Sequence, residues 1–415
     1  MIEELKLSDL ITLQRGFDIT KSEQVDGPFP VISSGGISSY HNKFKVKGPG
    51  IVIGRKGTLG KVFYCKHNFW PHDTSLWVKD FKGNDPKFIY YFLQVLHFEK
   101  FDAGAANPTL NRNHIHSLKL TVPKKEFRSK IASILSAYDD LIENNNKRIE
   151  LLEEMAEEIY KEWFVRFRFP GYGNSKFFDK EGKEVPHGTK GALPDGWEIQ
   201  PINKIVDIIS GYAFKSDTFE EEGDYKLVTI KNVQNGFFVT KTSDCIKELP
   251  KNLKKNIFLK DKDILLSLTG NIGRICLVYG DNYLLNQRVA KLKPKTENLF
   301  EYVYLFFRSD FLRKTLENHS NGAAQQNLSP VDMSELKFLT PNDNLLEKFS
   351  SITKSLFEEI IILLKKNQIL QETRDLLLPR LISGKLSLED LEIEQMNMAA
   401  EPQPEYYIGK NSMNE

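Results

Sequence analysis

The strongest constraint on this chain is that it contains one segment twice. Residues 104–123 read GAANPTLNRNHIHSLKLTVP and residues 322–341 read GAAQQNLSPVDMSELKFLTP, and the two align without a gap at an offset of 218 residues. Solenoid and propeller repeats have periods of roughly 20–50 residues, so this repeat is of another kind. It indicates a duplicated two-part unit, in which a globule is followed by a long helix.

The repeat predicts a division of the chain into two globules, each of α/β (α+β) type, and two long helices. Short strands are expected around glycine-rich turns at Gly57 and Gly270, and helices are expected from Asp85-Pro86 and over Phe300–Asn318. The expected segments are a first globule (1–125), a first helix (126–167), an irregular linker (168–195), a second globule (196–343), a second helix (344–390) and a disordered acidic tail (391–415).

Each helical segment carries one apolar stripe with steps of three and four residues, which is typical of an amphipathic helix that needs a partner. The simplest partner is the other helix of the same chain. We therefore expect an antiparallel two-helix coiled coil with pseudo-twofold symmetry. Both stripes are interrupted by polar residues, at 143–148 and 365–368. These interruptions are either solvated turns or buried asparagines that set the register. Pro379 and Gly384 are expected to end the second helix.

Composition narrows the class of protein. The three cysteines (Cys65, Cys245 and Cys276) and eight histidines show no CxxC or HExxH spacing, so neither a disulfide framework nor a metal site is expected. The N-terminus is acidic rather than signal-like, and no apolar run reaches the length of a membrane span. We therefore expect a cytoplasmic protein without a cofactor of its own.

The net charge of +1 hides an uneven distribution. Residues 1–125 carry 18 Lys and Arg against 11 Asp and Glu, whereas residues 126–166 carry 6 against 10 and residues 389–415 carry 1 against 7. A basic first globule beside an acidic first helix and an acidic tail is a mild signature of polyanion binding.

The glycine-rich turns supply the first candidate contacts to a polyanion. Arg55, Lys56 and Thr58 surround Gly57, and such groups suit phosphates or the acceptor edge of guanine. A nucleotide-binding P-loop does not fit, since five residues separate Gly54 from Gly60-Lys61 and Val62 replaces the hydroxyl residue. The counterpart turn offers Thr269, Asn271 and Arg274. A solvated hairpin tip is an equally good explanation of both turns.

Further candidates lie in amide-rich segments and early turns. The candidates in and before the repeated segment are Asn107, Asn111, Arg112, Gln325, Gln326, Gln287 and Arg288. The last two belong to the polar trio Asn286-Gln287-Arg288, and Asp73-Thr74-Ser75 occupies the matching place in the first globule. Asn and Gln can pair with adenine, but they also cap helices and turns. Possible phosphate contacts in turns are Arg15, Lys21, Lys215, Lys231 and Asn232, for which ordinary surface turns are an equal alternative. The aromatic runs 90–92 and 306–307 favour core packing.

The chain resembles the specificity subunit of type I restriction–modification systems. The resemblance rests on the duplicated GAA segment, EEIYKEWFVRFRFPG (157–171), LPDGWE (193–198) and LLPRLISGKL (377–386), and it extends to about residue 390. It implies two target recognition domains spaced by a coiled coil, each reading one half of a bipartite asymmetric site in double-stranded DNA. It also implies two partner modification subunits that use S-adenosylmethionine to methylate adenine N6, and restriction subunits that use ATP and Mg²⁺. The chain itself would catalyse nothing and would serve defence against phage.

Two other classes of function remain as alternatives. An enzyme is disfavoured, because Asn107-Pro108-Thr109-Leu110 is not a methyltransferase motif and the acidic residues after Pro194 do not have nuclease spacing. A non-catalytic coiled-coil scaffold without sequence reading would explain the helices, but it would leave two divergent globules at matched positions unexplained.

Overall fold

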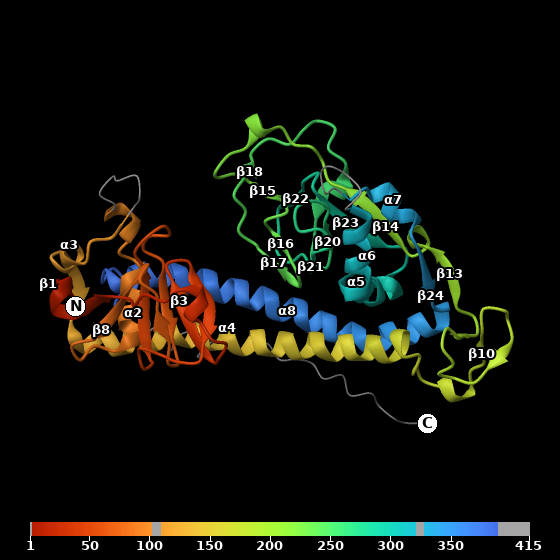
Figure 1. The fold of residues 1–415 in the computed structure, drawn as a ribbon. Helices are drawn as coiled ribbons and strands as arrows, with labels where there is room; N and C mark the ends of the chain where they lie inside the picture. Colours follow the sequence, from red (N-terminus) through yellow and green to blue (C-terminus); the bar gives the residue numbers. More distant parts are fainter. Residues whose placement is uncertain (1, 102–108, 321–327, 389–415) are drawn as a thin grey trace, which may run out of the picture. The chain divides into compact units, whose positions relative to one another are not determined.

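The computed structural model describes residues 2–101, 109–320 and 328–388 (Figure 1). Its internal contacts divide the chain into a first unit, residues 1–142 with 369–415, and a second unit, residues 143–368. Each unit contains one globule and a part of each long helix. The expected boundaries between globule and helix are therefore not the boundaries of the compact units.

The first unit is an α+β structure built mainly from antiparallel strands. Its four-stranded sheet has the order β2-β8-β5-β6, its three-stranded sheet the order β4-β3-β7 with a parallel β3–β7 pair, and β1 pairs with β9. The strands are β1 (Ile2–Lys6), β2 (Thr12–Arg15), β3 (Phe29–Ser33), β4 (Gly36–His41), β5 (Gly50–Gly54), β6 (Val62–Cys65), β7 (Trp70–Pro71), β8 (Ser75–Asp80) and β9 (Lys119–Pro123). The helices of its globule are α1 (Leu7–Leu10), α2 (Pro86–Gln94) and α3 (Arg112–His116).

Helix α2 forms where the sequence predicts it. The carboxylate of Asp85 accepts a hydrogen bond from the Lys87 amide at 2.7 Å, and Pro86 occupies the first helical position. Its buried face, which includes Tyr91 and Phe92, belongs to one apolar cluster with side chains of the four-stranded sheet and of the two long helices. The expectation that the aromatic run 90–92 serves core packing is confirmed for Tyr91 and Phe92, and Tyr90 is partly buried.

The second unit repeats this order of elements. Its four-stranded sheet is β14-β23-β20-β21, its second sheet is β18-β15-β22-β19 with a parallel β15–β22 pair, and β13 pairs with β24. The strands are β13 (Glu198–Pro201), β14 (Val206–Ser210), β15 (Tyr225–Val228), β16 (Val233–Gln234), β17 (Phe237–Phe238), β18 (Cys245–Ile246), β19 (Phe258–Leu259), β20 (Ile264–Ser267), β21 (Ile275–Leu277), β22 (Tyr283–Leu285), β23 (Val289–Pro294) and β24 (Lys337–Thr340).

The helices of this globule correct one expectation. Instead of one helix over 300–318, the chain forms α5 (Phe300–Arg308) and α6 (Asp310–Ser320), because Ser309 adopts an extended backbone conformation with ψ of 140°. Helix α7 (Pro330–Glu335) follows. Phe306 and Phe307 are buried, as core packing predicts.

Equivalent backbone positions show where the second globule is longer. The offset between matched residues grows from 195 for Gly16 and Gly211 to 213 for Gly54 and Ser267, and to 218 for the repeated segment. The main insertion therefore falls between β15 and β20, where the second unit adds the β16–β17 pair, whereas β18 pairs with β15 as β4 pairs with β3. The repeat visible in the sequence is the best-matched end of a structural repeat that spans both globules.

The segment between the two globules is more regular than expected. Residues 168–195 were expected to be irregular, but they contain the three-stranded sheet β11-β10-β12, formed by β10 (Phe177–Phe178), β11 (Glu184–Val185) and β12 (Leu193–Pro194). Phe177 is buried and its ring lies 4.8 Å from that of His187, so aromatic contacts stabilise this small sheet despite its glycines and prolines.

The long helices are α4 (Lys125–Tyr160), which continues as a π-helical turn at Lys161–Val165, and α8 (Asp343–Ile382). Within the second unit they run in opposite directions, since Asn145 pairs with Asn367 while Tyr160 packs on Phe349. Within the first unit Asp139 accepts from Arg374, and Ile131 packs in the same cluster as Leu381. The prediction that Pro379 ends the second helix is wrong, because α8 continues to Ile382 before Gly384 adopts a positive φ. The expected acidic tail lies outside the described residues.

The polar interruption of the stripe is buried in the second unit. Asn145 and Asn367 are only 8% and 6% exposed. The side-chain amide of Asn145 (Nδ2) donates to Asn367 Oδ1 at 2.9 Å, and that of Asn367 donates to Asn146 Oδ1 at 2.8 Å. Of the two readings given above, the contacts favour asparagines that set the register over solvated turns, since a slip of one helix would leave these buried amides without partners.

We expect Asn367→Leu to destabilise the helix pair of the second unit by about 1–3 kcal/mol, because Asn145 would then be buried without its partner. The double variant Asn145→Leu/Asn367→Leu should recover that loss, since no buried amide remains. Amide hydrogen exchange of residues 143–160 in denaturant measures both. Asn144→Ala, at an exposed position of the same helix, is the control. Equal protection in all four proteins would contradict a role for the pair.

Candidate nucleic-acid interface

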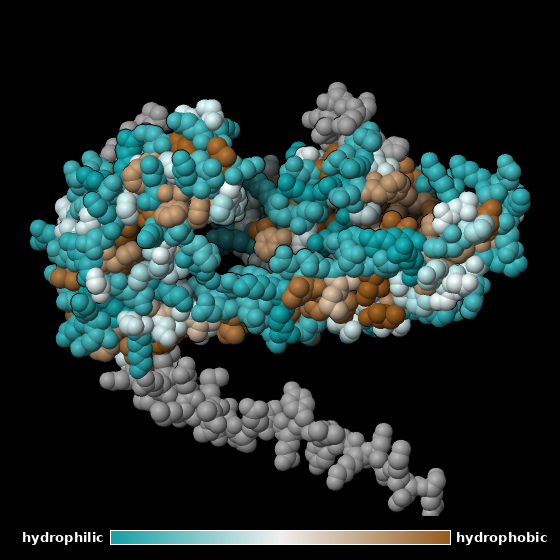
Figure 2. Space-filling model, turned by 60° about the horizontal axis from the view of Figure 1, so that its bottom comes forward, coloured by the Kyte–Doolittle hydropathy of each residue, from teal (hydrophilic) through white to brown (hydrophobic). Residues whose placement is uncertain are grey.

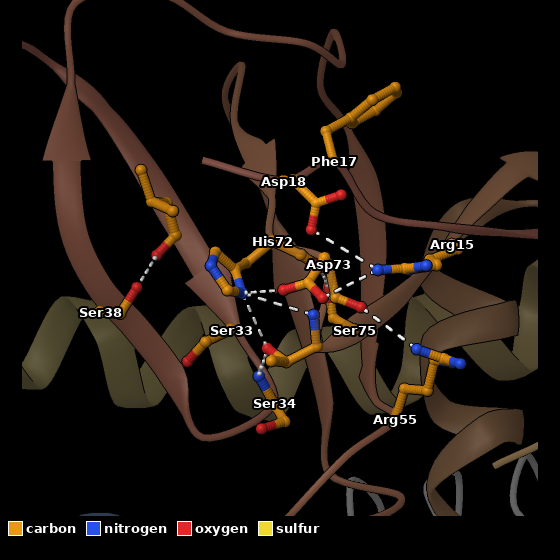
Figure 3. Close-up of polar contacts among 12 residues, drawn as sticks. Arg15, Phe17, Asp18, Ser33, Ser34, Ser38, Arg55, His72, Asp73 and Ser75 are labelled. Carbon is orange, nitrogen blue, oxygen red and sulfur yellow. Dashed lines mark hydrogen bonds and ion pairs between the residues drawn. The ribbon is translucent and has the colours of Figure 1, made fainter. Parts of the chain in front are cut away.

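Four segments of the first unit meet at one end of its four-stranded sheet (Figure 3). They are the end of β2, the β3–β4 turn, the β5–β6 loop and the β7–β8 turn. Main-chain hydrogen bonds join them: Phe17 N donates to Pro71 O at 2.8 Å, and the amides of Arg55 and Lys56 both donate to Thr74 O at 3.0 Å. We call residues 15–17, 33–36, 55–60 and 72–75 the first loop cluster.

Two glycines allow this arrangement. A Cβ at Gly16 would lie 2.1 Å from the carbonyl oxygen of His72, so the β2 end and the β7–β8 turn can approach only with a bare Cα at this position. Gly57 adopts a φ of 77° at the tip of the β5–β6 loop, where side chains other than glycine are strained. The conformation of the cluster is therefore set by the backbone and not by the polar side chains that it carries.

The side chains of the first loop cluster form a charged network centred on Asp73. Arg15 Nη2 donates to Asp73 Oδ2 at 3.0 Å, His72 Nδ1 lies 3.0 Å from Asp73 Oδ1, and Arg55 Nη1 lies 3.5 Å from the Asp73 carbonyl oxygen (Figure 3). Burial raises the pKa of the Asp73 carboxyl, but the hydrogen bond from Arg15 and the nearby charges outweigh it, so its pKa is lowered. Asp73 is therefore a carboxylate near neutral pH.

The second unit holds the equivalent segments with the same main-chain hydrogen bonds. Gly16 N to Ser75 O corresponds to Gly211 N to Val289 O, and Phe17 N to Pro71 O corresponds to Tyr212 N to Leu285 O. The bonds that hold the remaining loops also match in pairs: His72–Ile32 with Asn286–Val228, Ser75–His72 with Val289–Asn286, Gly54–Lys61 with Ser267–Arg274, Gly60–Gly54 with Gly273–Ser267, Arg55–Thr74 with Leu268–Arg288, and Leu110–Arg55 with Leu328–Leu268. We call residues 210–212, 228–230, 268–273 and 286–289 the second loop cluster.

The two clusters share a backbone and differ in side chains. A Cβ at Gly211 would lie 2.1 Å from the carbonyl oxygen of Asn286, the same approach as at Gly16. By these matched bonds, Asp73 of the first cluster is equivalent to Gln287 of the second. The other equivalent pairs are Arg15 with Ser210, Lys56 with Thr269, Thr58 with Asn271 and Thr74 with Arg288. One scaffold thus presents two different sets of hydrogen-bonding groups.

Several predicted residues of the first globule come together in this cluster. Arg15, Lys56 and Thr58 are exposed and Arg55 is partly buried. Leu110 N donates to Arg55 O at 3.0 Å, which joins the repeated segment to the β5–β6 loop. Asn111 caps helix α3 by accepting from the Asn113 amide at 2.9 Å, as the alternative of a capping role predicts, and Arg112 is exposed beside it. Lys21 lies on an exposed turn apart from the cluster, and Asn107 lies outside the described residues.

The predicted residues of the second globule divide in the same way. Asn271, Gln287 and Arg288 are exposed in the second loop cluster, with Thr269 partly buried beside them. Arg274 Nη1 donates to the Gln234 side chain. Lys215 and Lys231 are exposed on neighbouring turns. Gln325 and Gln326 lie outside the described residues.

Asn232 has a structural role in this structure. Its side chain is 2% exposed, and its amide donates to the carbonyl oxygens of Val239 at 2.8 Å and Lys241 at 3.1 Å. Its Oδ1 accepts from the Thr229 amide at 3.0 Å. Since all of its polar atoms hold the chain around β16 and β17, we do not include it in the candidate interface.

Sequence reasoning gave Asp73 no role of its own, although it noted that Asp73-Thr74-Ser75 occupies the place of Asn286-Gln287-Arg288. Nothing in the local sequence shows that Asp73 gathers Arg15, which lies 58 residues away in the chain. The matched positions in the two copies were the only available signal.

In the part of the chain that the structure describes, no group of three or more His, Cys, Asp or Glu side chains is arranged to hold a metal ion. Over the same residues, none of the helices combines the length and the apolar character that a membrane span requires.

Comparisons with known proteins agree with this geometry. The model of the family described as the type I restriction modification DNA specificity domain matches the chain twice, at residues 2–154 and 194–372. Each match covers one globule and part of the long helix that follows it. The chain is 28% identical over 351 residues to the specificity subunit of the type I restriction enzyme MjaIX of Methanocaldococcus jannaschii, which covers 82% of this chain and 78% of that protein.

Two further similarities cover different shares of the chain. The MjaVIII specificity subunit of the same organism is 24% identical over 413 residues, or 94% of each chain. A crystal structure of the S subunit of a type I restriction–modification system from M. genitalium superposes with a TM-score of 0.57 at 18% identity and covers 92% of this chain and 96% of that one. The structural match shows a shared fold.

Helix α3 connects the first loop cluster to a titratable group. His116 Nε2 accepts a hydrogen bond from the Leu13 amide on β2 at 2.9 Å, two residues from Arg15. The acceptor nitrogen must be unprotonated. Burial lowers the pKa of His116 from its ordinary value of 6.5, and the charges of Arg112 and Lys82 lower it further.

We expect the stability of the first unit to fall as pH drops below about 6.5, because His116 binds a proton more readily in the unfolded chain than in the folded one. The effect is absent above that pH and complete once the pH is below the lowered pKa of the folded state. Hydrogen exchange at the Leu13 backbone amide, followed as a function of pH, measures this change in stability. His116→Gln should remove this pH dependence, whereas His67→Gln, at an exposed position, should leave it in place. If stability depends on pH in the same way in both variants, the pH dependence arises from a group other than His116.

Proposed function

The chain belongs to the family of the type I restriction modification DNA specificity domain, and on that premise we propose that it is the DNA specificity subunit of a type I restriction–modification system. Each globule is a target recognition domain that reads one half of a bipartite, asymmetric site in double-stranded DNA. The chain catalyses nothing itself. It acts in the cytoplasm, where its DNA target is.

The pair of loop clusters is the observation that carries this proposal. Eight matched main-chain hydrogen bonds give both clusters one backbone arrangement. On it the first cluster presents Arg15, Arg55, Lys56 and Asp73, and the second presents Asn271, Gln287 and Arg288. Arg and Gln are the side chains that pair bidentately with guanine and adenine, and exposed Lys suits phosphate. Two equal scaffolds with unequal side chains suit two half-sites of different sequence.

We further propose that α4 and α8 form an antiparallel coiled coil with pseudo-twofold symmetry, which sets the spacing of the two half-sites. This extends to the whole chain the antiparallel helix contacts found within each unit. Their apolar stripes, which match at the offset of 218 residues, support it. The docking of the globules also supports fixed spacing, since Tyr91 bonds to Asp139 of α4 at 2.5 Å and Arg308 to Glu153 at 2.9 Å.

The same helices are proposed to bind two modification subunits. Apolar side chains reach the surface of the molecule (Figure 2, brown), and on the helices they include Leu151, which is 59% exposed, and Ile369, which is 61% exposed. These two residues are equivalent at the offset of 218 residues, one in each unit. Two equivalent exposed apolar positions suit two copies of one partner. S-adenosylmethionine, ATP and Mg²⁺ would be held by the modification and restriction subunits.

A coiled-coil scaffold without sequence reading is the alternative function. It would account for the helices and their exposed apolar positions. It gives no reason for the matched backbone of the loop clusters or for the different polar side chains that they carry.

Sequencing of methylated bases in host DNA, with and without the gene for this chain, tests the proposal. We expect adenine methylation at one split motif to disappear when the gene is deleted and to return with it. Exchange of residues 1–125 for another family member's first globule should change one half of the motif. If the reconstituted complex with its modification subunits binds all DNA sequences equally, the reader function is wrong and the scaffold alternative gains support.

We also expect Arg55→Ala and Lys56→Ala to weaken DNA binding by the complex, and a lost phosphate contact to reduce the slope of log K against log salt by about 1. Binding titrations over a range of salt concentrations measure both effects. Lys119→Ala, at an exposed position on β9 away from the cluster, should leave affinity and slope unchanged. Unaltered slopes for both cluster variants would show that the β5–β6 loop does not contact phosphate.

A further inference from the structure

We infer that Arg15 reads a guanine in the first half-site and that Asp73 is the positioning residue that orients it. This inference rests on the proposed function and assigns one base contact within it. The sequence alone suggested phosphate for Arg15. The contacts around its guanidinium favour a base edge instead.

The guanidinium of Arg15 is held from one side only. Its Nη2 donates to Asp73 Oδ2 at 3.0 Å and lies 3.5 Å from Asp18 Oδ1 (Figure 3). Both contacts are made by Nη2, and the closer one, with Asp73, is a hydrogen bond. The side chain of Arg15 is 50% exposed, whereas that of Asp73 is 17% exposed. The arginine therefore has a fixed edge toward the protein and a free edge toward solvent.

The residue that fixes Arg15 is itself fixed. Asp73 Oδ1 lies 3.0 Å from His72 Nδ1. The backbone around Asp73 is held by the His72 amide, which donates to Ile32 O at 2.9 Å, and by the Thr74 carbonyl, which accepts from two amides of the β5–β6 loop. A guanidinium bound on one edge by an immobile carboxylate loses little further rotamer freedom when it binds a planar target.

Charge distinguishes a base from a phosphate as that target. A phosphate on the free edge of Arg15 would approach the carboxylates of Asp73 and Asp18, and two like charges 4 Å apart repel by about 1 kcal/mol even in water and more at a partly buried site. The O6 and N7 atoms of guanine are neutral acceptors and incur much less of this repulsion. They also match two parallel N–H donors of arginine, one of them the second N–H of Nη2, whose first N–H is bonded to Asp73. The two carboxylates in contact with Arg15 therefore favour guanine.

The second loop cluster has no equivalent of the Arg15–Asp73 pair. Ser210 replaces Arg15 and Gln287 replaces Asp73 at the equivalent positions. The guanine contact is therefore specific to the first half-site, and a substitution at Gln287 provides a matched control within the same protein.

The test uses the complex of the full chain with its modification subunits and a panel of duplexes in which each base pair of both half-sites is varied in turn. In Arg15→Lys, we expect the preference for guanine at one position of the first half-site to fall roughly 5- to 150-fold, the range for one bidentate contact. Lysine keeps the charge but not the fork, so the salt slope should not change. Asp73→Asn should relax the same position, and Asp73→Glu should restore part of the preference. Gln287→Ala should affect only the second half-site.

The outcomes separate this inference from the proposed function. If Arg15→Ala weakens binding to every duplex equally and lowers the salt slope, Arg15 contacts phosphate and the inference is wrong. If Arg15→Lys and Asp73→Asn leave every base preference unchanged while the unsubstituted complex still discriminates, the inference is wrong and the proposed function stands. If the unsubstituted complex does not discriminate, the proposed function fails first. Should Asp73→Asn not fold, as judged by thermal unfolding, Arg15→Lys decides alone.

Discussion

The main-chain hydrogen bonds that join four loops at the end of each four-stranded sheet are the constraint on which the rest of this structure depends. An amide and a carbonyl are present at every residue except proline, so these bonds impose almost no requirement on side chains. They do impose a steric requirement, since Gly16 and Gly211 must lack a Cβ where the chain meets the opposing turn. Once that requirement is met, the side chains of the loops are free to serve recognition. For this reason one backbone arrangement can carry the charged network around Asp73 in the first cluster. In the second cluster it carries the side chains of Gln287 and Arg288.

The helices depend on a different balance. Their apolar stripes supply most of the stabilisation by burial, since nonpolar contact is favourable but tolerates several registers. The buried Asn145–Asn367 pair adds the specificity that apolar contact lacks. The globules are attached to the helices by polar contacts of similar geometry, with Arg374 and Tyr91 sharing Asp139 in the first unit and Arg308 bonded to Glu153 and Glu157 in the second. Partly buried charges of this kind are costly to leave without partners, so they favour one orientation of a globule on its helix.

The sequence predicts the parts of this fold that follow from periodicity and repetition. The stripes predicted two long helices, the matched glycines predicted the two hairpins, and Asp85-Pro86 predicted the start of α2. Its failures have physical causes. The sheet in the linker depends on aromatic contacts such as Phe177 with His187, and Pro379 lies within α8 although proline usually ends a helix. Among candidate contacts, the sequence could suggest Arg15 and Arg55 by residue type. It could not separate Asn232, which is buried, from Lys231, which is exposed, because that difference arises only when the chain around β16 and β17 folds back on Asn232.

The division of labour between backbone and side chains in the loop clusters has a consequence for how such a protein can change over generations. A substitution at an exposed position such as Gln287 removes no bond that holds the fold, so its cost in stability should be small. Variants with altered recognition would therefore remain folded and abundant, and selection would act on them through what they bind. A lineage with this architecture can explore new DNA targets one residue at a time.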